Sequence, residues 1–517
     1  MNFFAGNKLV ASDSGITPPD LKPTLDKDLS KISAMERASG SVGRTLVFPG
    51  LAIVFIAGTA AITMGLTNGA PGSMMIAAAA AIGAYMAINI GANDVANNVG
   101  PAVGSKALTL VGALIIAAIC ESAGALLAGG DVVGTISKGI VSRESVADPR
   151  IFTLLMMSAL ISAAVWINLA TVLGAPVSTT HSIVGGVAGA GIAAAGFAAV
   201  DWGEMSRIAA SWVISPVLGG VIAASFLAFI KIRIIYRDDK IAAARRWVPV
   251  LVAIMAGAFS AYLALKGLKK IDFIKHAIDG DVVKALGVGL VAAVITWMIS
   301  KPLIKRQSES MENRNRSLRA LFKIPLIFSA ALLSFAHGAN DVANAIGPLA
   351  AIVSTVQEGQ VADKVDIPLW VMMIGALGIS FGLALFGPKL INMVGAQITK
   401  LNPMRAFCVA LSAAITVIIA SWLALPVSST HIAVGGVFGV GFFREWYTAK
   451  SKRRRDYIRR QVGRRTAEEV AINSDVKRQR RLVRRHHFMT IIAAWLITVP
   501  VAGILSGSIF MLLTHLM

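Results

Sequence analysis

An acidic, amide-rich cluster interrupts one of the most apolar stretches of the sequence. The segment GANDVANNVGP, residues 91–101, places Asp94, Asn97 and Asn98 at helical spacing, so the three side chains share one face. The cluster returns as GANDVANAIGP at residues 338–348. Burying a carboxylate in hydrocarbon costs several kcal/mol, so a repeated acid in such a segment indicates function.

Carboxylate, amide and carbonyl oxygens are the ligands that a hard cation such as sodium prefers. Gly91, Gly100 and Pro101 flank the first cluster and favour local unwinding, which would free carbonyl oxygens for the same ion. The candidate cation-coupling residues are the acids and amides of the two clusters and one further acid in an apolar segment: Asp94, Asp341, Asn93, Asn340 and Glu121. Two alternatives stay open: a polar network that only joins helices, and a Glu121 capped by nearby serine or backbone groups.

A second repeated motif carries hydroxyl groups. PVSTTH begins at Pro176 and PVSSTH at Pro426, and each proline stops an incoming helix while suiting the first turn of the next one. The hydroxyls then lie beside unpaired N–H groups at a helix N-terminus, where an anion binds readily. The candidate anion ligands are Ser178, Thr179, Thr180, Ser428, Ser429 and Thr430. Alternatively, these residues only cap their helices.

A histidine follows each hydroxyl motif. His181 and His431 could contact the anion or relay protons, because histidine changes its charge near neutral pH. A buried histidine with a purely structural role is the other interpretation.

Composition indicates a polytopic helical membrane protein. The chain has 517 residues, of which 56% are hydrophobic and 15% charged, against roughly 25% charged in soluble proteins. Several apolar runs, such as 46–66, 155–173 and 489–513, reach the ~20 residues that cross a bilayer. The net charge of +21 is concentrated in a few loops, which is typical of cytoplasmic loops that touch anionic lipid. We therefore expect a lipid membrane and no nucleic acid as partner.

The paired motifs define two repeats. Asp94 and Asp341 are 247 residues apart and Pro176 and Pro426 are 250 apart, and SWVISP at 211 and AWLITVP at 494 form a weaker third pair. The predicted organisation is a polar cytoplasmic N-terminal tail, a first transmembrane repeat, a basic linker with a connecting span, and a second transmembrane repeat that contains a basic cytoplasmic loop: residues 1–45, 46–230, 231–282, 283–513 and 444–488.

Basic loops fix the orientation of these spans. With the basic loops inside, the two repeats have opposite topology, and the two hydroxyl motifs lie at the tips of re-entrant hairpins that enter from opposite sides. We therefore predict an all-α polytopic membrane protein with two inverted-topology repeats, broken helices and re-entrant hairpins. This is the organisation of a secondary transporter with its site at the midplane.

Charge balance within the predicted site implies coupling. Asp94 and Asp341 would repel a nearby anion strongly at low dielectric, and no lysine or arginine lies inside the motifs. The anion should therefore bind only with sodium or protons, which is the basis of symport.

We expect no enzyme, because the acids and His181 have neither metal-ligand spacing nor a nucleophile–base arrangement. A passive channel is disfavoured because acids line an anion path poorly. We expect no metal site and no cofactor beyond the coupling ion.

The doubled GANDVAN and PVS(S/T)TH motifs resemble those of the inorganic phosphate transporter (PiT) family over residues 46–513. The resemblance implies import of inorganic phosphate driven by a sodium or proton gradient, with phosphate between the hairpins and the acidic helices. It implies that Asp94, Asn97, Asp341 and Asn344 serve cations and shape the phosphate site, and that the six hydroxyls bind phosphate. We expect a multi-pass protein of the inner (plasma) membrane, and a homodimer stays open.

One departure from the family pattern concerns the coupling ion. Sodium-coupled members resemble each other in having a glutamate before each later motif; Glu121 keeps it in the first half, whereas Ala410 stands where the second is expected. Proton coupling, with phosphate protonated or carried as a neutral metal complex, is thus equally open. A sulfate permease of the same architecture is the alternative function, although only phosphate could donate hydrogen bonds to Asp94 or Asp341.

Overall fold

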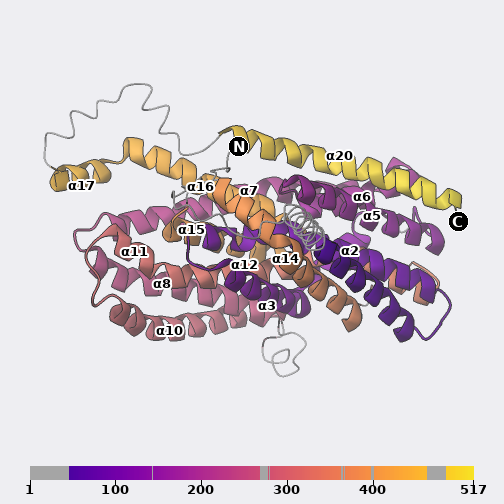
Figure 1. Ribbon diagram of the computed structural model, residues 1–517, viewed down its shortest axis with the longest axis horizontal. Coiled ribbons are helices and arrows are strands. Elements are labelled where there is room, and N and C mark those ends of the chain that lie inside the picture. The colour runs from indigo at the N-terminus through magenta and orange to yellow at the C-terminus, as the bar shows by residue number, and fades with distance from the viewer. Residues whose placement is uncertain are drawn as a thin grey trace, which may run out of the picture. The chain divides into compact units, whose positions relative to one another are not determined.

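The computed structural model describes residues 46–142, 144–267, 280–361, 367–397, 401–462 and 485–516, with the single residues 278 and 365. The chain divides into two compact units, residues 1–51 and 52–517, and the packing reported below lies within the second. Within the described ranges, eleven helices are long and apolar enough to cross a membrane (Figure 1). This confirms the predicted all-α polytopic class. The predicted N-terminal tail and most of the basic loop at 444–488 lie outside the described residues.

The first predicted repeat contains the helices α2 (Ser73–Gly104), α3 (Leu110–Ala128), α4 (Gly130–Lys138), α5 (Pro149–Leu173), α6 (Thr179–Ala195) and α7 (Trp202–Ile230). The connecting region contains η2 (Lys231–Ile235) and α8 (Lys240–Tyr262). The second predicted repeat contains α10 (Val282–Gln307), α11 (Asn315–Leu321), α12 (Lys323–Asp341), α13 (Ala343–Glu358), α14 (Leu369–Gln397), α15 (Pro403–Trp422), α16 (Ser429–Lys450), α17 (Lys452–Val462) and α20 (Arg485–Leu516).

Both hydroxyl motifs lie at a break between two antiparallel helices, as the prolines predicted. Helix α5 ends at Gly174, whose φ of 74° is a left-handed conformation that glycine adopts without strain. Helix α15 ends before Ala424, which also has a positive φ, of 55°. Helices α6 and α16 then begin directly after Ser178 and Ser428. Each motif therefore forms the tip of a helical hairpin.

The two acidic clusters differ in backbone form. In the second half, α12 ends at Asp341 and α13 begins at Ala343, but Val342 between them keeps helical angles (φ −57°, ψ −33°), so the helix is distorted there without unwinding. In the first half, α2 continues without interruption through Asp94 to Gly104. The predicted unwinding around Gly91 and Gly100 is wrong, because Gly91 serves packing: a methyl group there would overlap the backbone carbonyl of Ile379 in α14.

Close helix crossings repeat between the two halves. Gly91 of α2 lies against Ile379 of α14, and the matching Gly338 of α12 lies against the backbone of Glu121 in α3. Between these crossings, the hydroxyls of Ser122 and Ser380 are 2.6 Å apart. The counterpart of Glu121 in the second half is therefore Ile379. Our alignment of Glu121 with Ala410 is wrong, because Ala410 lies in α15, a hairpin helix.

The third sequence pair, SWVISP and AWLITVP, lies in α7 and α20, the helices that pack against the second helix of each hairpin. Helix α20 runs beside α6, and α7 runs beside α16 (Figure 1). Gly189 meets Gly503 and Gly439 meets Gly220 so closely that a methyl group at Gly189 or Gly439 would overlap the opposite backbone. In membranes, where apolar side chains gain little by leaving lipid, such small-residue contacts hold helices together.

Candidate functional site

The two acidic clusters and the two hairpin tips meet in one buried site. Asp94 and Asp341 are 0% and 1% exposed. Asp94 accepts hydrogen bonds from the Thr430 hydroxyl at 2.8 Å and from the Thr179 hydroxyl at 3.0 Å. Asp341 accepts one from the Ser429 hydroxyl at 3.1 Å, and its Oδ2 lies 3.4 Å from the Thr179 oxygen. Hydroxyls predicted to bind an anion thus hydrogen-bond to the acids predicted to bind a cation.

The amides one turn after each acid reach the hairpin of the other half. The Nδ2 group of Asn97 donates to the Thr430 hydroxyl oxygen at 2.9 Å. The Nδ2 group of Asn344 lies 3.1 Å from the Thr180 hydroxyl oxygen and 3.3 Å from that of Thr179. Asn97 and Asn344 therefore contact the hydroxyls of the hairpin tips. Their predicted role in the phosphate site requires this position.

The amides before each acid make matching contacts to the hairpin turns. The Asn93 side chain donates to the Thr171 hydroxyl at 2.9 Å and accepts from the Val177 N–H at 3.2 Å. Asn340 donates to the Ser421 hydroxyl at 3.0 Å and accepts from the Val427 N–H at 3.3 Å. Both amide ends are thus engaged in bracing a turn, and their predicted role as cation ligands stays a prediction.

Two of the six predicted anion ligands act as helix caps. The side-chain oxygens of Ser178 and Ser428 accept the backbone N–H of His181 at 3.1 Å and of His431 at 3.3 Å. Such caps satisfy an N–H group that the helix leaves unpaired. Each serine hydroxyl keeps its hydrogen for a ligand, so the capping role and the predicted anion contact are compatible.

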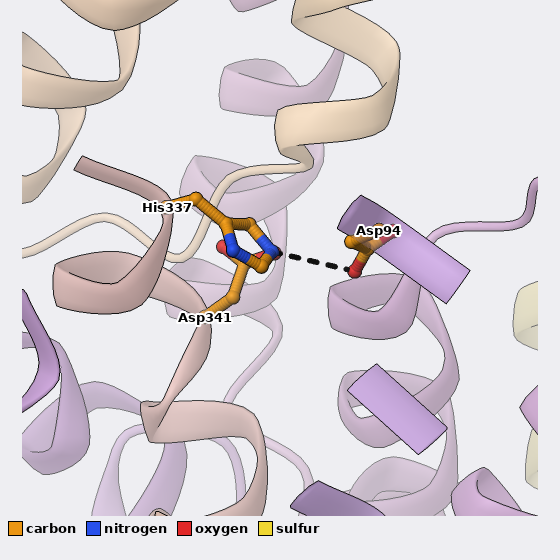
Figure 2. A group of neighbouring side chains, drawn as sticks. All are labelled: Asp94, His337 and Asp341. Atoms are coloured by element: carbon orange, nitrogen blue, oxygen red, sulfur yellow. Dashed lines mark ion pairs between the residues drawn. The ribbon is translucent and has the colours of Figure 1, made fainter. Parts of the chain in front are cut away.

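A third ionisable group lies between the acids. His337 of α12 is 0% exposed, and its Nε2 atom is 3.2 Å from Oδ2 of Asp341 and 3.6 Å from Oδ2 of Asp94 (Figure 2). Its Nδ1 atom is 3.4 Å from Oε1 of Glu121. One ligand atom each from Asp94, His337 and Asp341 lies within 4.8 Å of the others. This arrangement could hold a cation, although we expected no metal site from the sequence.

Glu121 extends the site on the first-half side. It is 0% exposed and accepts a hydrogen bond from the Asn98 amide at 2.7 Å, while its Oε2 atom has no hydrogen-bond partner among the described residues. The cap anticipated for this acid is therefore Asn98, not serine or backbone. The second half has Ala345 and Ile379 at the matching places, so this polar pair is not duplicated.

The two histidines after the hairpin tips contact aromatic rings. His181 lies 3.8 Å from Trp212 and His431 lies 3.7 Å from Trp495, measured between ring centroids, and the two imidazoles are 4.4 Å apart. Within the described part of the chain, none of their ring nitrogens has a hydrogen-bond partner. The predicted proton relay through them is untested.

Sequence reasoning missed His337. The available signal was a histidine four residues before Asp341, on the same helix face and inside an apolar segment. The predicted site residues were those that occur twice, and the first half has Ile90 at the position that matches His337.

Chemically, the site offers hydroxyl and amide donors beside two acids and one base, all enclosed between membrane-spanning helices. These residues can bind an anion and a cation together. The fold and site therefore define an integral membrane transporter.

Comparison with known proteins agrees with this class. The sequence model described as the Phosphate transporter family matches residues 90–506. The chain belongs to this family, and its function, at the level of the family, is phosphate transport.

Individual relatives are similar over most of their length. A protein of Helicobacter pylori named as a phosphate permease is 44% identical over 94% of this chain and 98% of its own. One of Pyrococcus abyssi, similarly named, is 36% identical over 84% of this chain and 96% of its own. A solved structure entitled "The sodium-dependent phosphate transporter" has a TM-score of 0.73 and 33% identity, and it covers 86% of this chain and 100% of its own.

Proposed function

We propose that this protein imports inorganic phosphate by symport with a cation, sodium or proton, and that both bind between two inverted repeats. The proposed phosphate ligands are the hydroxyls of the hairpin tips with Asn97 and Asn344. The proposed cation ligands centre on Asp94 and Asp341, with Glu121 nearby. We place the protein in the cytoplasmic (inner) membrane, with the basic segments inside.

One observation carries this proposal: three of the six hydroxyls that a phosphate would need already donate their hydrogens to carboxylates. Thr430 donates to Asp94 and Ser429 donates to Asp341. A hydroxyl has a single hydrogen to donate. Phosphate binding through these groups must therefore take hydrogen bonds away from the acids.

That exchange requires a cation. After it, two buried carboxylates would have lost hydroxyl donors and, with His337 between them, would face an added anion at low dielectric, where like charges repel strongly. A sodium ion on the carboxylate oxygens, or protons on them, would remove this cost. Phosphate and cation therefore favour each other's binding, and this mutual dependence is the basis of coupled transport.

The paired contacts support the proposed inversion of the two repeats. Asn97 reaches the second-half hairpin and Asn344 reaches the first-half hairpin. Hairpins that enter from opposite sides of the bilayer would bring their tips together in this way. Rocking of one repeat against the other would then expose the shared site to each side in turn.

Uptake into proteoliposomes tests the proposal. The purified full chain is reconstituted, and labelled phosphate is offered under a sodium gradient alone or a pH gradient alone, with and without excess sulfate. We expect uptake that follows one gradient and that sulfate does not reduce. Uptake that ignores both gradients would contradict symport, and sulfate uptake in place of phosphate would overturn the substrate.

A further inference from the structure

A cavity separate from the proposed transport site is lined by lysine and arginine side chains. It lies at the end of the helices where the basic segments gather. The cavity has a volume of about 210 Å³. Its cationic residues come from four different elements: Lys231 of η2, Arg319 of α11, Arg405 of α15 and Arg444 of α16. No acidic residue is among the described residues that line it.

The arrangement of Lys231 shows that this charge is held in place. The residue is only 8% exposed, and its Nζ atom lies 4.5 Å from the ring centroid of Tyr447 and 5.2 Å from that of Phe443. Within the part of the chain that the structure describes, no carboxylate lies within ion-pair distance of this amine. A cation–π contact orients such an amine but leaves its charge without a counter-anion.

Neutral donors complete the lining. Tyr236 lines the cavity, and burial raises the pKa of its phenol, so the group stays protonated and can donate a hydrogen bond to an anion. The cavity also includes Asn402, the N-cap of α15, so the positive end of that helix lies at the cavity. Four cations held around one cavity repel each other, and a multivalent anion would relieve this repulsion.

The size of the cavity sets the class of ligand. A single water molecule needs only about 10–15 Å³ of such space, so the cavity exceeds what one small ion would fill. Arginine pairs with phosphate oxygens through two parallel hydrogen bonds, which makes a three-arginine lining suited to phosphate groups. The geometry points to a binding site for an anion that carries several phosphate charges, either a soluble polyphosphate or an anionic lipid headgroup.

The site lies at the open end of the hairpin whose tip carries Ser429 and Thr430. Arg405 is near the start of α15, and Arg444 is 15 residues after Ser429 in α16, or roughly 22 Å along a helix that rises 1.5 Å per residue. An anion bound here joins both arms of this hairpin to α7–η2 and α11. It therefore contacts the hairpin that carries Ser429 and Thr430 at the end far from the tip, outside the proposed transport site.

Direct binding tests this site independently of transport. The full chain in phosphatidylcholine nanodiscs is titrated calorimetrically with tripolyphosphate. We compare the double variant Arg319→Gln/Arg444→Gln with the matched control Arg316→Gln/Lys450→Gln, which removes the same charge from the same two helices at exposed positions that do not line the cavity. The first variant should bind at least about tenfold more weakly than the wild type, and the control should bind like the wild type.

Two results would overturn the site: absence of tripolyphosphate binding to the wild type, or an equal loss in both variants. The single variant Arg319→Gln, which changes an exposed side chain, serves if the double variant does not fold. Nanodiscs with added phosphatidic acid distinguish the two sources of ligand. Weaker tripolyphosphate binding there assigns the site to a lipid headgroup, and unchanged binding assigns it to a soluble anion.

Discussion

Thr430 donates its hydroxyl hydrogen to Asp94 across 2.8 Å, although the two residues are 336 positions apart. Asn97, one turn after Asp94, donates to the same hydroxyl oxygen at 2.9 Å. The first-half helix and the second-half hairpin are thereby joined at a carboxylate that membrane hydrocarbon would not tolerate alone. Any ligand that accepts the hydrogen bond of the Thr430 hydroxyl removes that hydrogen bond from Asp94.

Neutralising either acid should abolish coupled uptake. Asp94→Asn and Asp341→Asn preserve side-chain size but remove the charge that a coupling cation would balance. We expect each variant to reach the membrane and to elute as the wild type does in gel filtration, with gradient-driven phosphate uptake lost. A variant with normal coupled uptake would refute the cation role of that acid.

Removing the Thr430 hydroxyl should weaken phosphate recognition. Thr430→Val deletes a hydrogen bond to a charged group, worth about 1.5–3 kcal/mol, which corresponds to roughly tenfold or more in the KM for phosphate. Thr416→Val is the matched control, because this buried threonine donates within its own helix to the Ser412 carbonyl. Equal KM values for the two variants would reduce the hairpin tip to a structural element.

The two capping serines should affect stability as well as transport. Ser178→Ala and Ser428→Ala each leave an N–H group at a helix start without its partner, a loss of about 1 kcal/mol. We expect a lower thermal midpoint and, since the phosphate contact is also lost, a higher KM in uptake assays. Ser451→Ala, which removes a cap outside the site in front of α17, should lower stability without changing KM.

Close packing at Gly91 should be sensitive to one added methyl group. Gly91→Ala would overlap the Ile379 carbonyl and force α2 away from α14, so the detergent-solubilised protein should melt at a clearly lower temperature. Gly100→Ala lies in the same helix with nothing within 4 Å of the new methyl group. It should be neutral or slightly stabilising, because alanine favours a helix more than glycine does. Matching losses in both variants would contradict the packing role.

Much of the site was predictable because its residues occur twice. Asp94 and Asp341 could be grouped with the two hairpin tips from the sequence, since acids and prolines are costly in apolar segments and rarely recur there in pairs without a shared function. His337 was missed because the first half has Ile90 at the matching position.

Backbone form near the acids was harder to predict. Gly91 and Pro101 suggested unwinding, yet α2 is continuous and Pro101 lies in its last turn. Whether a glycine loosens a helix or allows a neighbouring helix to approach depends on what packs against it. The approach of α14 to Gly91 is a feature of the tertiary structure, which the local sequence does not show. The match of Glu121 with Ile379 was hidden for the same reason, because only helix pairing reveals it.

Equilibrium binding of labelled phosphate to the purified protein, without any membrane gradient, tests the central claim most directly. Binding is measured across sodium concentrations at fixed pH and across pH without sodium. If phosphate takes hydrogen bonds from Asp94 and Asp341, its affinity must rise as one of these cations is added, and Asp341→Asn must remove that dependence. Phosphate affinity that is the same at all sodium and proton concentrations would contradict the account.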